Sequence, residues 1–150
     1  MLRGLTTLSF YADDLTAARS WYAEVLGIDA YYAFPAEGTP AYVEFRIGDY
    51  EHELGIIDSR YAPADRPDQP GGVVAYWHVD DLQASLDRLL ALGATLHLPV
   101  TEQGDDSGFV TASVVDPFGN ILGIMSNPHY LEILAARTQA RTEATAQHTS

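Results

Sequence analysis

The sequence predicts an α+β fold in which two βαβββ modules follow one another in a single domain of 150 residues. Three landmarks carry this prediction, because each occurs twice, in the same order, at spacings of 66 to 68 residues. They are a short strand that runs into Asp-Asp-Leu (residues 7–15 and 74–82), a glycine that ends a helix (Gly27 and Gly93), and a strand that begins Leu-Gly-Ile (residues 54–57 and 122–125). Three matches in one order indicate an internal duplication.

The first module is expected over about residues 5–60. Its first strand leads into Asp14, whose short carboxylate suits the N-cap of a helix. The helix is predicted from apolar residues at a period of 3.6, which are Leu15, Ala18, Tyr22 and Val25. Gly27 suits the left-handed conformation that ends it. Strands are then expected at residues 31–34, 41–47 and 53–57.

A linker separates the modules at residues 61–72, where three prolines and two glycines interrupt any regular pattern. The second module, residues 73–127, repeats the first: Asp81 suits an N-cap, and the helix shows the same apolar period at Leu82, Leu86, Leu89 and Leu90. Strands are expected at residues 95–100, 109–115 and 121–125. The last two are joined by Asp-Pro-Phe-Gly-Asn at residues 116–120, which has the composition of a turn.

The chain is predicted to close with a helix over residues 129–141 and a small, polar tail over residues 142–150 that frays. Residues 128–150 are therefore assigned to a C-terminal helix and tail.

Composition excludes several classes of function. The chain has no cysteine and a formal charge of −13, and all eight of its basic residues are arginine. Disulfides, thiolate nucleophiles, and lysine Schiff bases are thus excluded. An acidic chain is a poor partner for nucleic acid or an anionic membrane, since both attract basic patches. No apolar stretch approaches the roughly 20 residues of a membrane span, so a cytoplasmic protein is predicted.

Strand alternation separates a core face from a second, polar and aromatic face. The apolar residues at alternate positions are expected to cover the helices. Twelve side chains are predicted on the opposite face, and these form the candidate site: Thr7, Ser9, Tyr11, Tyr42, Glu44, Arg46, Glu53, Tyr76, His78, Phe109, Thr111 and Ser113. Aromatic walls with a few polar groups are typical of small-molecule sites, although a half-exposed sheet shows the same alternation.

Three sets of side chains on this face have two interpretations each. His78 is either a general base or a hydrogen-bonded wall residue. Glu53 is either a base whose pKa is raised by burial or a solvated strand residue. Glu44 and Arg46 are either a charge pair that grips a ligand or an exposed pair of little consequence.

The tandem βαβββ units, the strand–Asp–Leu helix starts and the Asp-Pro-Phe-Gly-Asn hairpin together resemble the vicinal oxygen chelate superfamily. This superfamily includes glyoxalase I, bleomycin resistance proteins and extradiol dioxygenases. The resemblance covers about residues 5–127. It implies a cupped, half-open mixed β-sheet barrel with the helices outside, and a homodimer in which the cup is built within one chain or across two.

The resemblance also implies where a divalent metal would be held: by one residue near the start of the first strand and one on the last strand of each module. In this sequence these positions are Thr7, Gly55, Val74 and Gly123. Glycine and valine have no donor side chain, so no metal or other cofactor is expected. If the ligand positions are shifted along the strands, only Glu53 and His78 become available as metal ligands. These are fewer than the three protein ligands that a catalytic metal site normally has.

The sequence therefore predicts a metal-free protein that binds an aromatic or cationic small molecule, most similar to the drug-sequestering bleomycin resistance branch. The alternative is an enzyme. In one version it keeps a displaced divalent metal and is a glyoxalase-type lyase or isomerase, or a dioxygenase. In the other version it is metal-free and performs acid–base chemistry through His78, Glu53 or Glu44, with Tyr11 or Tyr76 as proton donor. A third interpretation is a partner-binding scaffold with a vestigial cup.

Overall fold

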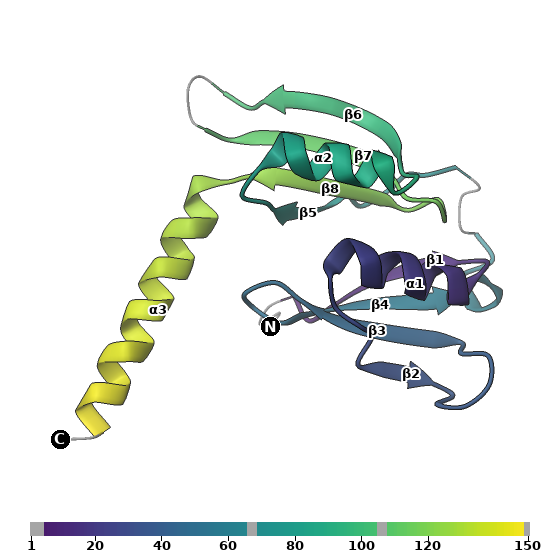
Figure 1. Ribbon diagram of the computed structural model, residues 1–150, viewed down its shortest axis with the longest axis horizontal. Coiled ribbons are helices and arrows are strands. Elements are labelled where there is room, and N and C mark those ends of the chain that lie inside the picture. The colour runs from purple at the N-terminus through teal and green to yellow at the C-terminus, as the bar shows by residue number, and fades with distance from the viewer. Residues whose placement is uncertain (1–4, 66–68, 105–107, 149–150) are drawn as a thin grey trace.

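The computed structural model describes residues 5–65, 69–104 and 108–148 and shows two four-stranded mixed sheets with three α-helices (Figure 1). The predicted linker and tail lie partly outside these residues. In chain order the elements are β1 (Thr7–Ala12), α1 (Leu15–Leu26), β2 (Tyr32–Phe34), β3 (Tyr42–Ile47), β4 (His52–Asp58), a 3₁₀ turn (Ser59–Tyr61), β5 (Ala75–His78), α2 (Leu82–Ala91), β6 (Thr95–Glu102), β7 (Val110–Val115), β8 (Ile121–Ser126) and α3 (Pro128–His148).

The two sheets have the same topology, which confirms the predicted α+β fold and its duplicated modules. The first sheet has the order β1-β4-β3-β2 and the second β5-β8-β7-β6. In each, the first strand of the module runs parallel to the last, and the other pairings are antiparallel. Figure 1 shows α1 against the first sheet and α2 against the second, on the same side of the molecule. The two sheets do not close into a barrel.

Local sequence signals set the helix ends where they were predicted. The Asp14 carboxylate accepts a hydrogen bond from the Ala17 backbone N–H at 2.9 Å, and Asp81 accepts from Ala84 at the same distance. Each thereby satisfies one of the donors left unpaired at a helix N-terminus. Gly27 ends α1 with φ of 69°, a conformation that favours glycine.

One apolar core joins the helices to the inner faces of both sheets. Val43, Phe45 and Ile56 of the first sheet and Val114 of the second are completely or almost completely buried. Burial alternates along β3 as predicted. It does not alternate along β4, β7 and β8, where Gly55, Ser113 and Gly123 of the predicted opposite face are buried as well.

The modules are also joined by polar contacts. The Trp21 indole N–H of α1 donates to the Leu92 carbonyl after α2 at 2.7 Å, and Arg88 of α2 donates to the Glu24 carbonyl at 2.7 Å. The turn at residues 116–120 reaches across to the first module through Asn120. Its amide accepts from the Tyr11 N–H at 3.2 Å and donates to the Tyr11 carbonyl at 3.0 Å.

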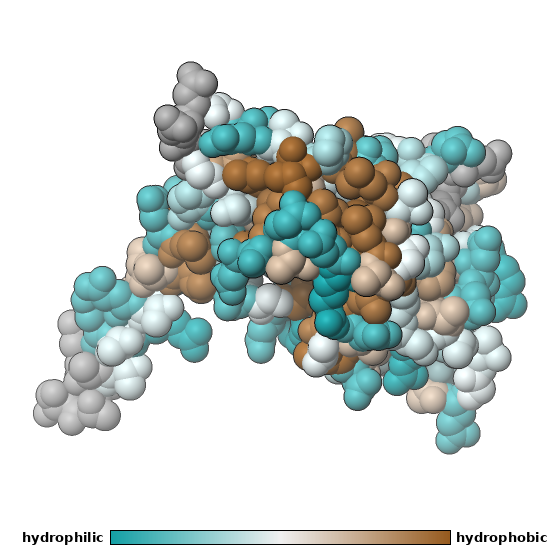
Figure 2. All heavy atoms as spheres, turned by 45° about the horizontal axis from the view of Figure 1, so that its top comes forward, coloured by the Kyte–Doolittle hydropathy of each residue, from teal (hydrophilic) through white to brown (hydrophobic). Residues whose placement is uncertain are grey.

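The edge strand β6 is longer than predicted and exposes all of its residues. Its pairing with β7 continues to Glu102 through two register shifts, and Pro99 lies between the shifted segments. Proline is tolerated in edge strands because no neighbour needs its missing N–H. Leu96 and Leu98 remain about half exposed, and Figure 2 shows hydrophobic side chains gathered over the middle of one face of the molecule.

The terminal helix α3 also extends beyond its predicted end, since it reaches His148 instead of stopping near residue 141. The hydroxyls of Thr138 and Thr142 donate hydrogen bonds to backbone carbonyls one turn earlier. These threonines are therefore accommodated in the helix, because their side chains bond to its backbone without ending it. Figure 1 shows α3 projecting away from the sheets. No helix within the described residues has the length and apolar character needed to cross a membrane.

Replacing Tyr22 with phenylalanine tests the polar link between the modules. The Tyr22 hydroxyl donates to the Asp116 carboxylate at 2.6 Å, and both residues are at least 97% buried. Removing one donor to a buried charge is expected to lower the free energy of unfolding by about 1.5–3 kcal/mol. Urea denaturation measures the change. The control is Tyr61→Phe at a position 63% exposed, where a change within about 0.5 kcal/mol is expected; equal losses in both variants would contradict the link.

Candidate functional site

The first sheet brings five of the predicted site residues together on its open face. Thr7 donates to the Glu53 carboxylate at 2.6 Å, and the Arg46 guanidinium lies 3.7 Å from the same carboxylate. The Tyr42 hydroxyl donates to the Glu44 carboxylate. The register explains the grouping, because Arg46 pairs with Glu53 across the antiparallel ladder and Thr7 pairs with Glu53 across the parallel one.

Two tyrosine rings of the candidate site lie directly on glycines. A Cβ at Gly55 would stand 2.5 Å from the Tyr42 hydroxyl oxygen, and a Cβ at Gly123 would stand 2.6 Å from the Tyr76 ring. Such distances are far below van der Waals contact, so each ring occupies space that a side chain would need. Gly55 and Gly123 are the last-strand positions at which the resemblance places metal ligands, and here a phenol ring covers each of them.

Negative charge dominates the open face of the first sheet. Partial burial raises the pKa of Glu44 above its ordinary value, the charge of Glu53 raises it further, and Arg46 offsets part of the effect. Burial and the charge of Glu53 likewise raise the pKa of Tyr42. A cation placed on this face would relieve the repulsion between the two carboxylates.

The second sheet groups Tyr76, Thr111 and Ser113, which were predicted on one face. Thr111 accepts a hydrogen bond from the Gln103 amide at 3.0 Å, and the Ser113 hydroxyl lies 3.0 Å from His97 Nδ1. Phe109 directly precedes β7 and is half-buried. Sequence reasoning did not include His97 in the site, because the register shifts of β6 defeat simple alternation.

His78 lies apart from the other candidates. Its ring stacks on Tyr130 of α3 with centroids 4.7 Å apart, and its Nδ1 accepts from the Asn127 N–H at 3.2 Å. No hydrogen bond, ion pair or ring contact joins His78 to Glu53 in the described part of the chain. The structure therefore does not bring these two predicted acid–base residues together.

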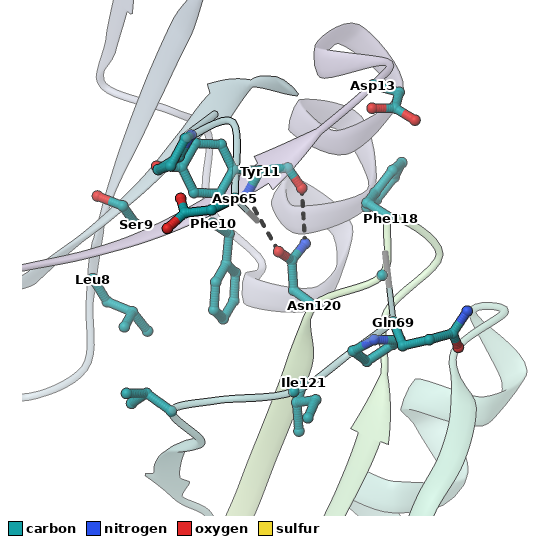
Figure 3. A pocket seen from close by; sticks show the side chains of 15 residues that line it. Leu8, Ser9, Phe10, Tyr11, Asp13, Asp65, Gln69, Phe118, Asn120 and Ile121 are labelled. Atoms are coloured by element: carbon teal, nitrogen blue, oxygen red, sulfur yellow. Dashed lines mark hydrogen bonds between the residues drawn. The ribbon is translucent and has the colours of Figure 1, made fainter. Parts of the chain in front are cut away.

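An open cavity of about 600 Å³ lies where β1, the linker and the β7–β8 turn meet. Figure 3 shows Tyr11, Ser9 and Asp65 on one side of it and Phe118, Gln69 and Ile121 on another, with Asn120 bridging to the Tyr11 backbone. Ser9 and Tyr11 were predicted site residues. The contributions of the linker and the turn were not predicted, because nothing in their composition distinguishes a cavity wall from a connection.

The cavity is acidic and aromatic. Asp13 and Asp65 contribute carboxylates, and Tyr11 and Phe118 contribute rings. The charge and the aromatic faces therefore both favour a cation.

The donor set for a metal is poor at the positions the resemblance indicates. Thr7, Gly55, Val74 and Gly123 together offer one neutral hydroxyl, which already donates to Glu53. Within the part of the chain that the structure describes, no three His, Asp or Glu side chains come together in an arrangement that could hold a metal ion. These residues do not fit a divalent metal.

Comparison with known proteins places this geometry in a family. The family model of the Glyoxalase/Bleomycin resistance protein/Dioxygenase superfamily matches residues 4–124. No curated protein matches the chain.

Solved structures share the fold at low identity. TioX from Micromonospora sp. ML1 is 18% identical with a TM-score of 0.60, over 83% of this chain and 98% of that one. A glyoxalase-related enzyme from Fulvimarina pelagi is 21% identical with a TM-score of 0.60, over 85% and 90%. A glyoxalase/bleomycin resistance protein/dioxygenase from Nocardioides is 17% identical with a TM-score of 0.62, over 84% of each chain. The duplicated βαβββ topology and the family match over residues 4–124 together show that the chain belongs to the glyoxalase/bleomycin resistance protein/dioxygenase superfamily.

Proposed function

We propose that this protein binds a small aromatic cation, without a metal, in the cavity between β1, the linker and the β7–β8 turn. The observation that carries the proposal is the cavity's composition: a volume of about 600 Å³, aromatic side chains in the lining and two carboxylates. Its volume falls within the roughly 300–1,000 Å³ of small-molecule sites.

Each feature of the cavity supplies one part of the recognition. The ring of Tyr11 offers a face for offset stacking and for cation–π attraction. Asp65, which Figure 3 shows on the same side of the cavity, supplies a carboxylate for the positive charge. The acidity of the whole chain adds attraction at longer range. Drug sequestration, which the resemblance to bleomycin resistance proteins implies, is a function this arrangement suits.

The covered glycines support the metal-free part of the proposal. A metal ligand at position 55 or 123 would have to displace the Tyr42 or Tyr76 ring. The phenol rings also give the open sheet faces flat apolar surfaces in place of a metal-binding centre.

The alternative of acid–base catalysis is favoured by one observation, the Tyr42–Glu44 hydrogen bond on the open face. The pKa of Glu44 is raised, and a carboxyl of raised pKa is a better general acid near neutral pH than an ordinary one. Because no described interaction joins His78 to Glu53, this alternative depends on carboxylates and a phenol as its acid and base groups.

Binding of a matched pair of probes tests the proposal. 9-Aminoacridine is a flat cation at neutral pH, and anthracene-9-carboxylate is an anion of similar shape. Fluorescence titration is expected to show saturable binding of the cation and none of the anion at the same concentrations. Asp65→Asn should weaken binding of the cation about 5- to 10-fold, which corresponds to about 1–1.4 kcal/mol.

The matched control for that titration is Asp87→Asn, which removes the same charge from an exposed position on α2. It is expected to change the affinity less than 2-fold, since surface charges are screened beyond about 10 Å at moderate salt. Equal losses from the two variants would show attraction to net charge alone and would contradict a site in the cavity.

Metal content tests the metal-free state. The protein, purified without a chelator and without a histidine tag, is offered Mn, Fe, Co, Ni and Zn ions in turn, desalted, and analysed for metal per chain. Bound metal far below one per chain is expected, because the described donors do not cluster. Near-stoichiometric metal that is lost in Glu53→Gln would instead make a metal-dependent lyase or dioxygenase the leading function.

Alanine substitutions at the covered glycines test the tyrosine platforms. Gly123→Ala is expected to lower the free energy of unfolding by about 1–3 kcal/mol, because the added Cβ would lie 2.9 Å from the backbone oxygen of Ala75 as well as against the Tyr76 ring. Gly55→Ala should cost less, since its three nearest atoms all belong to the Tyr42 side chain, which is able to swing aside.

The control for this pair is Gly71→Ala, where the nearest atom is 3.9 Å from the added Cβ. Urea denaturation should show little change there. Adding Tyr42→Ala should remove the cost of Gly55→Ala, whereas adding Tyr76→Ala should remove only part of the cost of Gly123→Ala. Equal, small effects at positions 55, 71 and 123 would contradict the close approach of the rings.

A further inference from the structure

An apolar cavity of about 300 Å³ lies on the core side of both sheets, where the two modules meet. It is separate from the cavity of the proposed function, because the described linings of the two share no residue. Most of its described lining is apolar. The first module contributes Val25, Leu26 and Leu54, and the second contributes Trp77 and Ile124. The cavity therefore suits an apolar group, which would contact both modules at once.

Part of the apolar lining of this cavity remains accessible to water. Four of its side chains pack against the buried core but are themselves only half-buried, and these are Val25, Leu26, Trp77 and Val79. Removing their remaining apolar surface from water is favourable for any ligand that covers it. The half-buried side chains thus give the cavity both an entrance and a contact surface.

Arg88 of α2 adds a positive charge at the edge of the cavity. Its guanidinium donates to the Glu24 backbone carbonyl of α1 at 2.7 Å, so the side chain extends from one helix to the other. The two residues that follow Glu24, which are Val25 and Leu26, line the cavity together with Arg88 itself. Arg88 is exposed, and its guanidinium is therefore held beside the apolar lining within reach of a ligand.

The hydrogen bonds of this guanidinium determine what it can still bind. A guanidinium has five N–H donors, and the bond to the Glu24 carbonyl uses one of them. Arg60 differs, because its guanidinium is occupied by the Asp58 carboxylate at 2.8 and 3.0 Å. A carboxylate suits the remaining donors of Arg88 best, since its two oxygens can accept parallel bonds from one guanidinium. Positive charge beside apolar walls thus favours an apolar molecule with a carboxylate.

We propose that this cavity binds a small apolar molecule with one carboxylate, whose apolar body lies between the modules and whose carboxylate lies on Arg88. The volume is about twice that of a cavity that holds benzene, so a body of two fused rings is of suitable size. The Trp77 indole in the lining offers a flat surface for such rings. This site prefers an anion, whereas the carboxylates of the larger cavity favour a cation.

Calorimetric titration with two probes of one shape tests the proposal. 2-Naphthoate is an anion at neutral pH, and 2-naphthamide is its neutral counterpart. The wild-type protein is expected to bind the anion about 5-fold more tightly than the amide, as suits an ion pair that is partly exposed to water. Arg88→Gln, which removes the charge, should bind the two probes equally. Arg88→Lys, which keeps the charge, should retain part of the preference.

The matched control is Arg19→Gln, which removes the same charge from an exposed position of α1 outside the described lining. It should leave the preference unchanged, and so should Asp65→Asn, which alters the lining of the larger cavity. Ser85→Phe, which narrows the cavity from α2, should weaken the binding of both probes. Absence of naphthoate binding to the wild type, equal binding of the two probes, or equal losses in Arg19→Gln and Arg88→Gln would overturn the proposal.

A measurement on the wild-type protein does not depend on the folding of the variants. The chain has two tryptophans, and their indole N–H resonances are followed by NMR as 2-naphthoate is added. Trp77 lines the cavity, whereas the Trp21 indole donates to the Leu92 carbonyl outside the described lining. The Trp77 resonance should shift, and the Trp21 resonance should stay in place. A Trp77 resonance that shifts no more than that of Trp21 would overturn the proposal.

Discussion

The buried carboxylate of Asp116 holds the two modules in register. It accepts four hydrogen bonds: from the Tyr22 hydroxyl of α1, from the Asn120 side-chain amide, and from the backbone N–H groups of Phe118 and Asn120. A carboxylate 3% exposed needs this many donors, because water does not solvate it. With Asn120 fixed in this way, its amide is oriented to bond both backbone groups of Tyr11. The β7–β8 turn, α1 and β1 are thus positioned by one charge, and so is one wall of the larger cavity.

Equivalent strands of the two modules carry chemically different side chains on the open faces of their sheets. The last strand of each has a glycine covered by a tyrosine, yet Tyr42 comes from a neighbouring antiparallel strand and Tyr76 from the parallel first strand. The arrangement around Tyr42 gathers charge, with Glu44 and Glu53 close by, whereas Thr111 and Ser113 near Tyr76 are neutral. The two open faces therefore differ chemically although their backbones correspond. Such divergence is expected after a duplication, since the fold constrains the core face and leaves the other free.

How much the sequence could predict depends on the range of the interactions involved. The caps at Asp14 and Asp81 and the alternation along β3 depend on neighbours within a few residues, and these predictions are confirmed. The 109-residue separation between Tyr11 and Asn120 leaves no local pattern, so the larger cavity was not predicted. His78 was placed on the right strand, but its partners Asn127 and Tyr130 follow the second module and determine its surroundings. The lining role of Asp65 likewise depends on the path of the linker.

The Asn120 amide also has a consequence for self-association. β1 is an outer strand of its sheet, and an outer strand presents unpaired backbone groups to which another chain could add. By occupying the N–H and carbonyl of Tyr11, Asn120 interrupts the free edge of β1 near its end. At the other outer edges, β2 has three residues, β5 has four, and β6 carries a proline and two register shifts. An acidic chain with these edges is protected against uncontrolled strand addition, which would otherwise threaten a protein built from two open sheets.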